Sequence, residues 1–145
     1  MLYFDVYWMQ VALQLASYAL QHDEVPIGAV LVKKQRIIGI GWNHPVSSND
    51  PTNHAEINTL RDAALNIGNY RLIDTTLYVT LEPCIMCLGA ILHARCDRIV
   101  FGAYDSKKLS KDLICKLRGN HVKYEGGILE RECGELLRSF FRLKR

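Results

Sequence analysis

The strongest constraint on the fold of this chain is the regular alternation of helical and strand-like segments along it. Apolar positions spaced three and four residues apart predict helices at residues 6–22, 50–68, 83–94 and 129–141. Short apolar runs predict strands at residues 27–32, 36–42, 77–81 and 98–103. Residues 107–117 are weakly helical, and residues 122–127 suit a short strand or turn. Because the first two strands resemble a hairpin and the later ones crossovers, the sequence predicts a three-layer α/β domain with a mixed sheet.

Length and composition favour one folded domain over residues 1–145. With 49% hydrophobic and 23% charged residues, the chain can close a core, unlike a disordered chain. Its five cysteines are odd in number and too few for a disulfide scaffold, which favours a reducing compartment and metal chemistry. The first twenty residues lack the basic start of a signal peptide, and no other stretch resembles a membrane span. We therefore expect a cytoplasmic protein.

Two short motifs at predicted helix starts carry candidate metal ligands. Cys84 and Cys87 lie three residues apart, so on a helix they share one face, and the positive end of the helix dipole favours their thiolates. His54 stands at the start of another predicted helix. One histidine and two thiolates leave the fourth position of a zinc ion open, as in catalytic zinc sites. In a first helical turn Glu56 reaches that position, where a carboxylate can take a proton from bound water.

A closed structural zinc site is the main alternative for these motifs. It needs a fourth ligand, either another histidine or one of Cys96, Cys115 and Cys133. None of these residues has a spacing that recommends it. Cys133 lies on the apolar face of the last predicted helix and Cys96 precedes a strand, so both suit core positions better.

The two motifs, H-x-E and P-C-x-x-C, together form the signature of zinc-dependent nucleobase deaminases. Longer segments extend the match: VPIGAVLV, DPTNHAEI, LYVTLEPCIMCLGAILHARCDRIVFGAYD and GGILERECGELLRSFF. Over nearly its whole length the chain resembles the tRNA-specific adenosine deaminases of the cytidine and deoxycytidylate deaminase superfamily. The resemblance implies a homodimer of the cytidine-deaminase-like fold, with three α/β/α layers around a five-stranded mixed sheet. It also implies conversion of adenosine to inosine at the wobble position of a tRNA anticodon, chiefly of an arginine tRNA.

The resemblance also implies roles for individual residues. A zinc-activated hydroxide would attack C6 of adenine, with Glu56 as the proton shuttle. The implied ligands of one Zn²⁺ per subunit are His54, Cys84 and Cys87. The implied substrate contacts are Asn43, the Ala55 backbone N–H, Asp105 and Lys107. Without the resemblance, Asn43 is also explained as a turn residue beside Gly41. Glu82 is expected to serve the start of its own helix rather than the chemistry.

The C-terminal third departs from the family pattern. After Asp105 the family has a turn rich in Gly and Ala, whereas this chain continues SKKLSKDLICKLRGNH, so the RNA contacts of residues 107–121 do not transfer. Its net charge of +3 is also uneven. Residues 1–106 hold seven Lys and Arg against ten Asp and Glu, and residues 107–145 hold eleven against five. We therefore expect the basic third to hold the tRNA backbone through Arg142, Lys144 and Arg145.

Two other functions remain consistent with the sequence. A deaminase of a free base or nucleotide, such as guanine, cytosine or deoxycytidylate, would carry the same zinc and glutamate but would need no basic surface. A non-catalytic zinc module that binds RNA would retain zinc and RNA binding while Glu56 was dispensable. Charge distribution, substrate assays and substitution of Glu56 separate these possibilities.

Overall fold

The computed structural model describes residues 3–106, 111–119 and 121–144. Its helices are α1 (Tyr3–Gln21), α2 (Pro45–Ser48), α3 (Ala55–Ile67), α4 (Ile85–His93), α5 (Lys111–Arg118) and α6 (Glu130–Leu143). Its strands are β1 (Gly28–Lys33), β2 (Arg36–Trp42), β3 (Thr76–Leu81), β4 (Arg98–Ala103) and β5 (Lys123–Glu125). Each predicted helix and strand is present, although residues 107–110 of the weakly helical segment lie outside the described residues.

The five strands of the described chain form one mixed sheet in the order β2-β1-β3-β4-β5. Strand β1 pairs antiparallel with β2 and β3, whereas β3, β4 and β5 run parallel. The β1–β2 hairpin turns at Lys34 and Gln35, which are both left-handed with φ of 51° and 63°. Such a turn matches the twist of the two strands that it joins. The mixed sheet expected from one hairpin followed by crossovers is confirmed.

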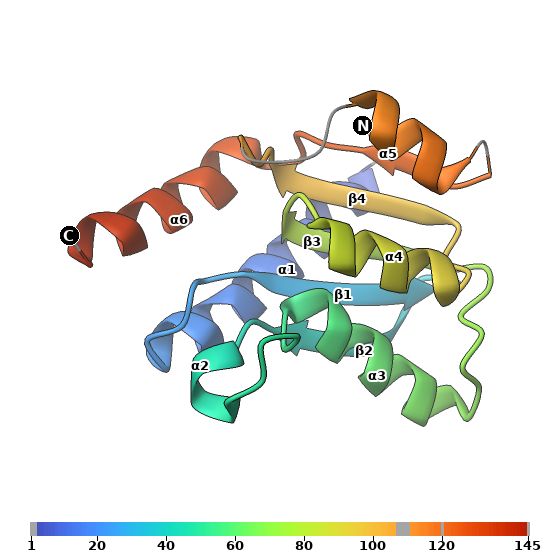
Figure 1. Cartoon of the computed structure of the whole chain (residues 1–145), viewed down its shortest axis with the longest axis horizontal. Helices are drawn as coiled ribbons and strands as arrows, with labels where there is room; N and C mark the ends of the chain where they lie inside the picture. The colour runs from blue at the N-terminus through green and yellow to red at the C-terminus, as the bar shows by residue number, and fades with distance from the viewer. Residues whose placement is uncertain (1–2, 107–110, 120, 145) are drawn as a thin grey trace.

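Helices cover both faces of the sheet (Figure 1). Helices α1 and α6 pack on one face, and α3 and α4 cover the other, with α5 beside α4. Alternate residues of β1 supply the two cores, because successive side chains of a strand point to opposite faces. Leu31 joins the core under α3 and α4, whereas Val30 and Val32 join the core under α1. The three-layer α/β/α prediction is confirmed.

A buried ion pair ties α1 to the parallel side of the sheet. Asp5 of α1 is 1% exposed and accepts two hydrogen bonds from the Arg98 guanidinium, each 2.7 Å long. The Tyr78 hydroxyl donates a third, at 2.8 Å, and Arg98 also donates to Glu125 of β5. Since an unpaired buried charge is strongly destabilising, this network fixes α1 against β3, β4 and β5.

Two helices begin later than the sequence indicates. Helix α3 begins at Ala55 rather than near residue 50, because the Asp50 carboxylate accepts hydrogen bonds from the Thr52 backbone N–H and hydroxyl and so forms a turn. Helix α4 begins at Ile85, after an extended N-cap residue, so Pro83 lies before the helix. The short helix α2, between β2 and this turn, was not expected from the sequence.

Helix α3 lies unusually close to β2. A Cβ atom added to Gly39 would come within 2.6 Å of the Thr59 carbonyl oxygen, and one on Gly41 equally near the Ala55 carbonyl oxygen. Only glycine permits that approach at these two positions. The small buried residues Ala55, Thr59 and Ala63 consequently form the part of α3 that lies against these glycines.

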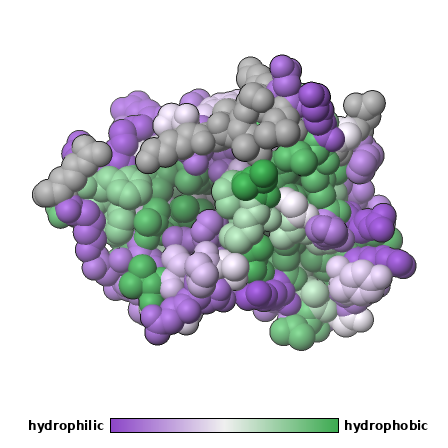
Figure 2. Space-filling view, in the orientation of Figure 1, coloured by the Kyte–Doolittle hydropathy of each residue, from purple (hydrophilic) through white to green (hydrophobic). Residues whose placement is uncertain are grey.

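The outer surface of α3 and α4 is partly apolar. The apolar spacing that predicts this helix puts Leu65 on one face with Ile57, Leu60 and Ala64, where it is expected to be buried. Leu65 is instead 83% exposed, because the glycines of β2 draw the small-residue face inward. Ile67 of α3 and Ile85 of α4 are exposed as well. Figure 2 shows hydrophobic surface over these helices. Among residues 3–106, 111–119 and 121–144, every helix is too short or too polar to cross a bilayer.

Candidate metal centre and active site

The N-terminal ends of α3 and α4 bring three potential metal ligands together. His54 is the N-cap of α3 and Cys84 the N-cap of α4, both with extended backbone, while Cys87 lies in the first turn of α4. The His54 Nδ1 atom lies 3.6 Å from the Cys84 Sγ atom and 3.5 Å from the Cys87 Sγ atom. All three ligand atoms lie within 4.8 Å of one another. The fold thus unites the three residues that the sequence proposes as ligands.

The donor set and its spacing fit a zinc ion. Zinc binds histidine nitrogen at about 2.0–2.1 Å and thiolate sulfur at about 2.3 Å, so tetrahedral nitrogen and sulfur ligands lie about 3.6 Å apart. The observed nitrogen–sulfur distances of 3.5 and 3.6 Å match that separation. The metal-ligating group found in the described residues has three members, which leaves one tetrahedral position for water or substrate.

The other cysteines occupy different surroundings. Cys96 is 2% exposed in the core under α3 and α4, and Cys133 is 1% exposed in the core under α1 and α6. Cys115 lies on the exposed side of α5. None of the three belongs to the ligand cluster of the described residues, so the arrangement favours an open site over a closed structural one.

Glu56 is a buried carboxyl group beside the thiols. It lies in the first turn of α3, is 4% exposed and approaches the Cys87 thiol within hydrogen-bonding reach. Burial raises the pKa of Glu56 to about 7, although its own backbone N–H opposes the shift. A group with a pKa near neutrality can both accept and return a proton, as general acid–base catalysis requires.

The two thiols of the cluster hold their protons unequally. A hydrogen bond from Cys87 lowers the pKa of Cys84 to about 4, and His54 contributes further. The pKa of Cys87 is raised, first by this hydrogen bond to Cys84 and then by burial. Hydrogen bonding to Cys84 also raises the pKa of His54. Among the protein groups alone, Cys84 is therefore the thiolate at neutral pH, which is the form that binds metals.

Ala55 directly follows the His54 ligand, and Asn43 is connected to the same segment through the backbone. Asn43 follows β2, is 5% exposed and donates its backbone N–H to the Ile27 carbonyl. The backbone N–H of the following residue, His44, donates at 3.1 Å to the carbonyl of Asn53, which directly precedes the His54 ligand. Ala55 opens α3, where a backbone N–H has no acceptor within the helix.

Asp105 reaches the same region from the end of β4. Its backbone N–H donates at 3.1 Å to the carboxylate of Glu82, which stands two residues before Cys84. Glu82 is 3% exposed and also accepts a 2.7 Å hydrogen bond from the Tyr124 hydroxyl. The sequence associates Glu82 with its own helix, whereas these bonds connect it to the loop after β4 and to β5. Lys107, the other predicted contact on this loop, lies outside the described residues.

Glu24 is a buried carboxylate that sequence reasoning missed. It is 2% exposed and accepts hydrogen bonds from the backbone N–H groups of Val46, at 3.2 Å, and Ser47, at 2.6 Å. Burial acts to raise its pKa, but these hydrogen bonds prevail and lower the pKa below its usual value. Glu24 thereby fixes α2, which follows Asn43. Its partners are more than twenty residues away, so local sequence carried no signal for this role.

A cavity of about 540 Å³ lies between the ends of β3 and β4 and one face of α6. Asp105 and Ser106 line it from the β4 loop, and Arg138 and Phe141 line it from α6. Arg138 is not among the cations predicted to contact RNA. The three-residue spacing that puts it on one face of the helix with Phe141 is the signal that could have found it.

Arg142 and Lys144, two of the three predicted RNA-binding cations, lie at the far end of α6. Arg142 donates at 3.1 Å to the Ser139 hydroxyl, and Lys144 forms a 2.6 Å ion pair with Asp23 after α1. Arg145 lies outside the described residues. Arg142 and Lys144 are therefore farther along the chain of α6 than the cavity-lining Arg138.

A protein-family sequence model shows which class of protein the chain belongs to. The sequence model of the cytidine and deoxycytidylate deaminase zinc-binding region matches residues 3–103. This stretch contains the histidine, both ligand cysteines and the buried glutamate of the cluster. Fold, ligand set and match together define a zinc-binding deaminase domain.

Similarity to individual proteins shows which family within this class the chain belongs to. A tRNA-specific adenosine deaminase from Buchnera aphidicola subsp. Schizaphis graminum is 52% identical over 97% of this chain and 96% of that protein. A structure from work on A-to-I editing by tRNA:A34 deaminases has a TM-score of 0.84 at 40% identity and covers 90% of this chain and 99% of that one. The chain belongs to the tRNA-specific adenosine deaminase family. A guanine deaminase from Bacillus subtilis is also similar, with a TM-score of 0.65 and 40% identity over 72% of this chain and 66% of that one.

Proposed function

We propose that this protein hydrolyses adenosine to inosine and ammonia at the wobble position of a tRNA anticodon, with an arginine tRNA as substrate. The observation that carries the proposal is the open cluster of one histidine and two cysteines with the buried carboxyl group of Glu56 beside it. Relatives named tRNA-specific adenosine deaminases support adenosine in tRNA as the substrate.

In this function His54, Cys84 and Cys87 hold the zinc ion. When bound, zinc lowers the pKa of a coordinated water, so that attack on C6 of adenine becomes possible near neutral pH. Glu56 takes the proton of that water, because its buried carboxyl group titrates near neutrality. It would give that proton to a nitrogen of the purine ring and then move the second proton of the water, from the hydroxyl formed on C6, to the departing amine. Water and adenosine are consumed, and ammonia and inosine are released.

Asn43 and the Ala55 backbone N–H hold the adenine in this proposal. This role is supported by Ala55 directly following the His54 ligand, and by the backbone hydrogen bond that joins His44, the residue after Asn43, to the residue before His54. A target base must leave the anticodon stack to reach such a buried group, and hydrogen bonds to its edge select it. Asp105 would contact the neighbouring nucleotide from the cavity between β4 and α6.

The RNA backbone is held outside this pocket. Arg138 and Phe141 of the cavity supply a cation and a stacking surface, which suit single-stranded RNA. Arg142, Lys144 and Arg145 would contact phosphates farther along α6, and Lys107 would do so from the β4 loop.

We also propose that the protein is a cytoplasmic homodimer. Exposed apolar side chains across α3 and α4, among them Leu65 and Ile85, support a second copy as the partner of that face. The five cysteines all lie in the described residues and form no disulfide with one another, which supports a reducing compartment.

An anticodon stem-loop with adenosine at the wobble position tests the proposed reaction. Zinc-loaded protein should convert that adenosine to inosine and leave free adenine, cytidine and guanine unchanged. The matched substrate carries adenosine at a neighbouring loop position. Faster turnover of free guanine would favour guanine deaminase activity, which the similarity to the Bacillus subtilis structure suggests. Binding of the stem-loop without any turnover would favour a non-catalytic RNA module.

A further inference from the structure

Helix α3 reaches the outer edge of β2 with three polar side chains spaced four residues apart. Asn58 donates at 2.9 Å to the Trp42 carbonyl, and Asn66 donates at 2.9 Å to the Ile38 carbonyl. Between them the Asp62 carboxylate accepts a 2.9 Å hydrogen bond from the Ile40 backbone N–H. Residues four apart share one helix face, and the glycines of β2 bring that face close enough for all three bonds.

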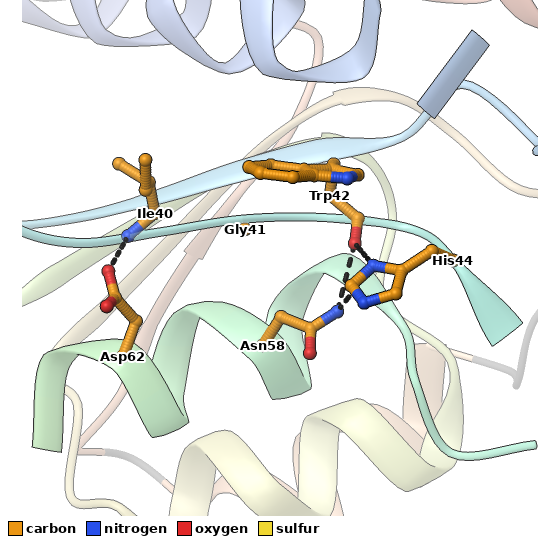
Figure 3. Close-up of a pocket in the computed structure, with 6 residues that line it drawn as sticks. All are labelled: Ile40, Gly41, Trp42, His44, Asn58 and Asp62. Carbon is orange, nitrogen blue, oxygen red and sulfur yellow. Dashed lines mark hydrogen bonds between the residues drawn. The ribbon is translucent and has the colours of Figure 1, made fainter. Parts of the chain in front are cut away.

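The Asn58 hydrogen bond differs from the other two because its acceptor oxygen also accepts from a second donor. The His44 Nδ1 atom also lies 2.9 Å from the Trp42 carbonyl oxygen. Since a carbonyl accepts only, that ring nitrogen carries the proton. Figure 3 shows Asn58 and His44 converging on this oxygen. Both residues line a cavity of about 320 Å³ along the strand edge.

These bonds lie directly beside Asn43. Its neighbours in the chain are Trp42 and His44. The Trp42 carbonyl accepts the Asn58 hydrogen bond, and the His44 ring contacts both that oxygen and the Asn58 side chain. Asn58 in turn lies one helical turn after the metal ligand His54, to whose carbonyl it donates its own backbone N–H at 3.1 Å. One side chain therefore joins the helix that holds the metal to the strand end that carries the base contact.

We propose that Asn58 is a positioning residue for deamination: it sets where Asn43 holds the base relative to the metal ligands on α3. The inference rests on the proposed function, because it assigns the base contact to Asn43. Displacements of about 1 Å in such a contact can cost up to about 100-fold in rate, so one lost bond at this junction is expected to matter. Asn58 acts through the backbone and touches neither base nor metal.

Asn66 supplies the matched control. It makes the same kind of hydrogen bond, of the same length, from the same helix to the same strand, but two turns farther from His54. Asn58→Ala should lower kcat/KM by about 10-fold with unchanged zinc content, whereas Asn66→Ala should stay within about twofold of the parent protein. A purely structural role would leave kcat/KM equal and reduce only thermal stability, more in Asn58→Ala, whose hydrogen bond is partly buried, than in Asn66→Ala, whose hydrogen bond is exposed.

A double-mutant cycle then asks whether Asn58 acts through Asn43. Once Asn43→Ala has removed the base contact, Asn58→Ala should cost less than about twofold more, while Asn66→Ala should add its own small effect unchanged. Full additivity of Asn58→Ala and Asn43→Ala, or equal kcat/KM for the two α3 variants, would overturn the proposal. Should Asn58→Ala lose zinc or fail to fold, Asn58→Ser enters the same cycle.

The experiments distinguish a wrong proposed function from a wrong role for Asn58. If the parent protein turns over free guanine rather than the stem-loop, the proposed function is wrong, and the cycle is run on guanine, where the same coupling to Asn43 is expected. If the parent turns over the stem-loop but the cycle shows no coupling, the proposed function stands and the role of Asn58 falls.

Discussion

The metal-bearing region and the C-terminal third use charge in opposite ways. In residues 1–106 several polar side chains in and around the candidate site are buried, and Glu24, Glu56, Glu82 and Asn43 are each at most 5% exposed. In the C-terminal third, the cations whose side chains the structure describes lie at the surface, and the Arg131 side chain is 83% exposed. The first region has three more acidic than basic residues, and the second has six more basic than acidic.

This contrast predicts how much individual side chains contribute. A buried charge must be matched by partners, so removing one group or its partner has a large effect. An exposed cation interacts through water and salt, so each one contributes little and several act together. A single substitution near the metal ligands should therefore remove almost all activity, whereas each substitution in α6 should weaken RNA binding only slightly.

Loss of a metal ligand is expected to have the largest effect. Cys87→Ala removes one of three ligands, so the protein should lose its single zinc ion and all measurable deamination, with a lower melting temperature. Metal analysis and the stem-loop assay measure both. Cys96→Ala and Cys133→Ala are the controls, because each removes a buried thiol outside the cluster. A zinc ion that persists in Cys87→Ala but is lost in either control would mean a different ligand set.

Substitution of Glu56 should come next. Glu56→Ala should retain zinc and fold but lower kcat by roughly 10²–10⁴-fold, because it removes the proton shuttle and leaves the ligands in place. Single-turnover kinetics with zinc-loaded protein measure the chemical step. Turnover close to that of the parent protein would show that another group moves the proton.

How well the sequence predicted each region follows from the distance between interacting residues. The metal ligands were predictable because His54 and Glu56 form one short motif, Cys84 and Cys87 form another, and both motifs stand at helix starts. The sheet and its layers were predictable for the same reason, since each hydrophobic pattern is local. The approach of the two motifs to within 3.6 Å depends on packing between distant segments, and only the family resemblance indicated it.

The residues that sequence reasoning missed depend on distant partners. Asp5 interrupts an apolar helix and gave no sign of Arg98, which lies 93 positions away. Glu24 and Glu82 likewise bond backbone groups more than twenty positions away. The exposure of Leu65 follows from glycines in β2, which no pattern within α3 reveals.

Neutralising the end of α6 tests the second region. Replacement of Arg142, Lys144 and Arg145 by alanine should weaken binding of the stem-loop by about 10-fold at low salt. It should also reduce the salt dependence of log Kd by up to about 2 units of slope, because fewer counterions are released. Zinc content and kcat should be unchanged. Arg131→Ala is the control on the same helix, since Arg131 pairs with Glu135. An affinity equal to that of the parent would place the RNA backbone elsewhere.

The smallest effect is expected where the two regions meet. Lys144 pairs with Asp23 at 2.6 Å, with side chains that are 48% and 74% exposed. Exposed pairs contribute about 0.2–1 kcal/mol, so Asp23 competes weakly with a phosphate for this lysine. Asp23→Asn should therefore strengthen stem-loop binding by less than about fivefold, with a larger gain at low salt than at high salt.

Asp74→Asn controls for the loss of one negative charge, because Asp74 is exposed and has no ion pair with Lys144. If Asp23→Asn and Asp74→Asn strengthen binding equally, the gain is a matter of net charge alone. If the gain of Asp23→Asn disappears once Lys144 is replaced by alanine, the ion pair itself restrains the lysine. In that case the acidic region does more than carry the metal: through Asp23 it sets how freely the basic region can reach the RNA.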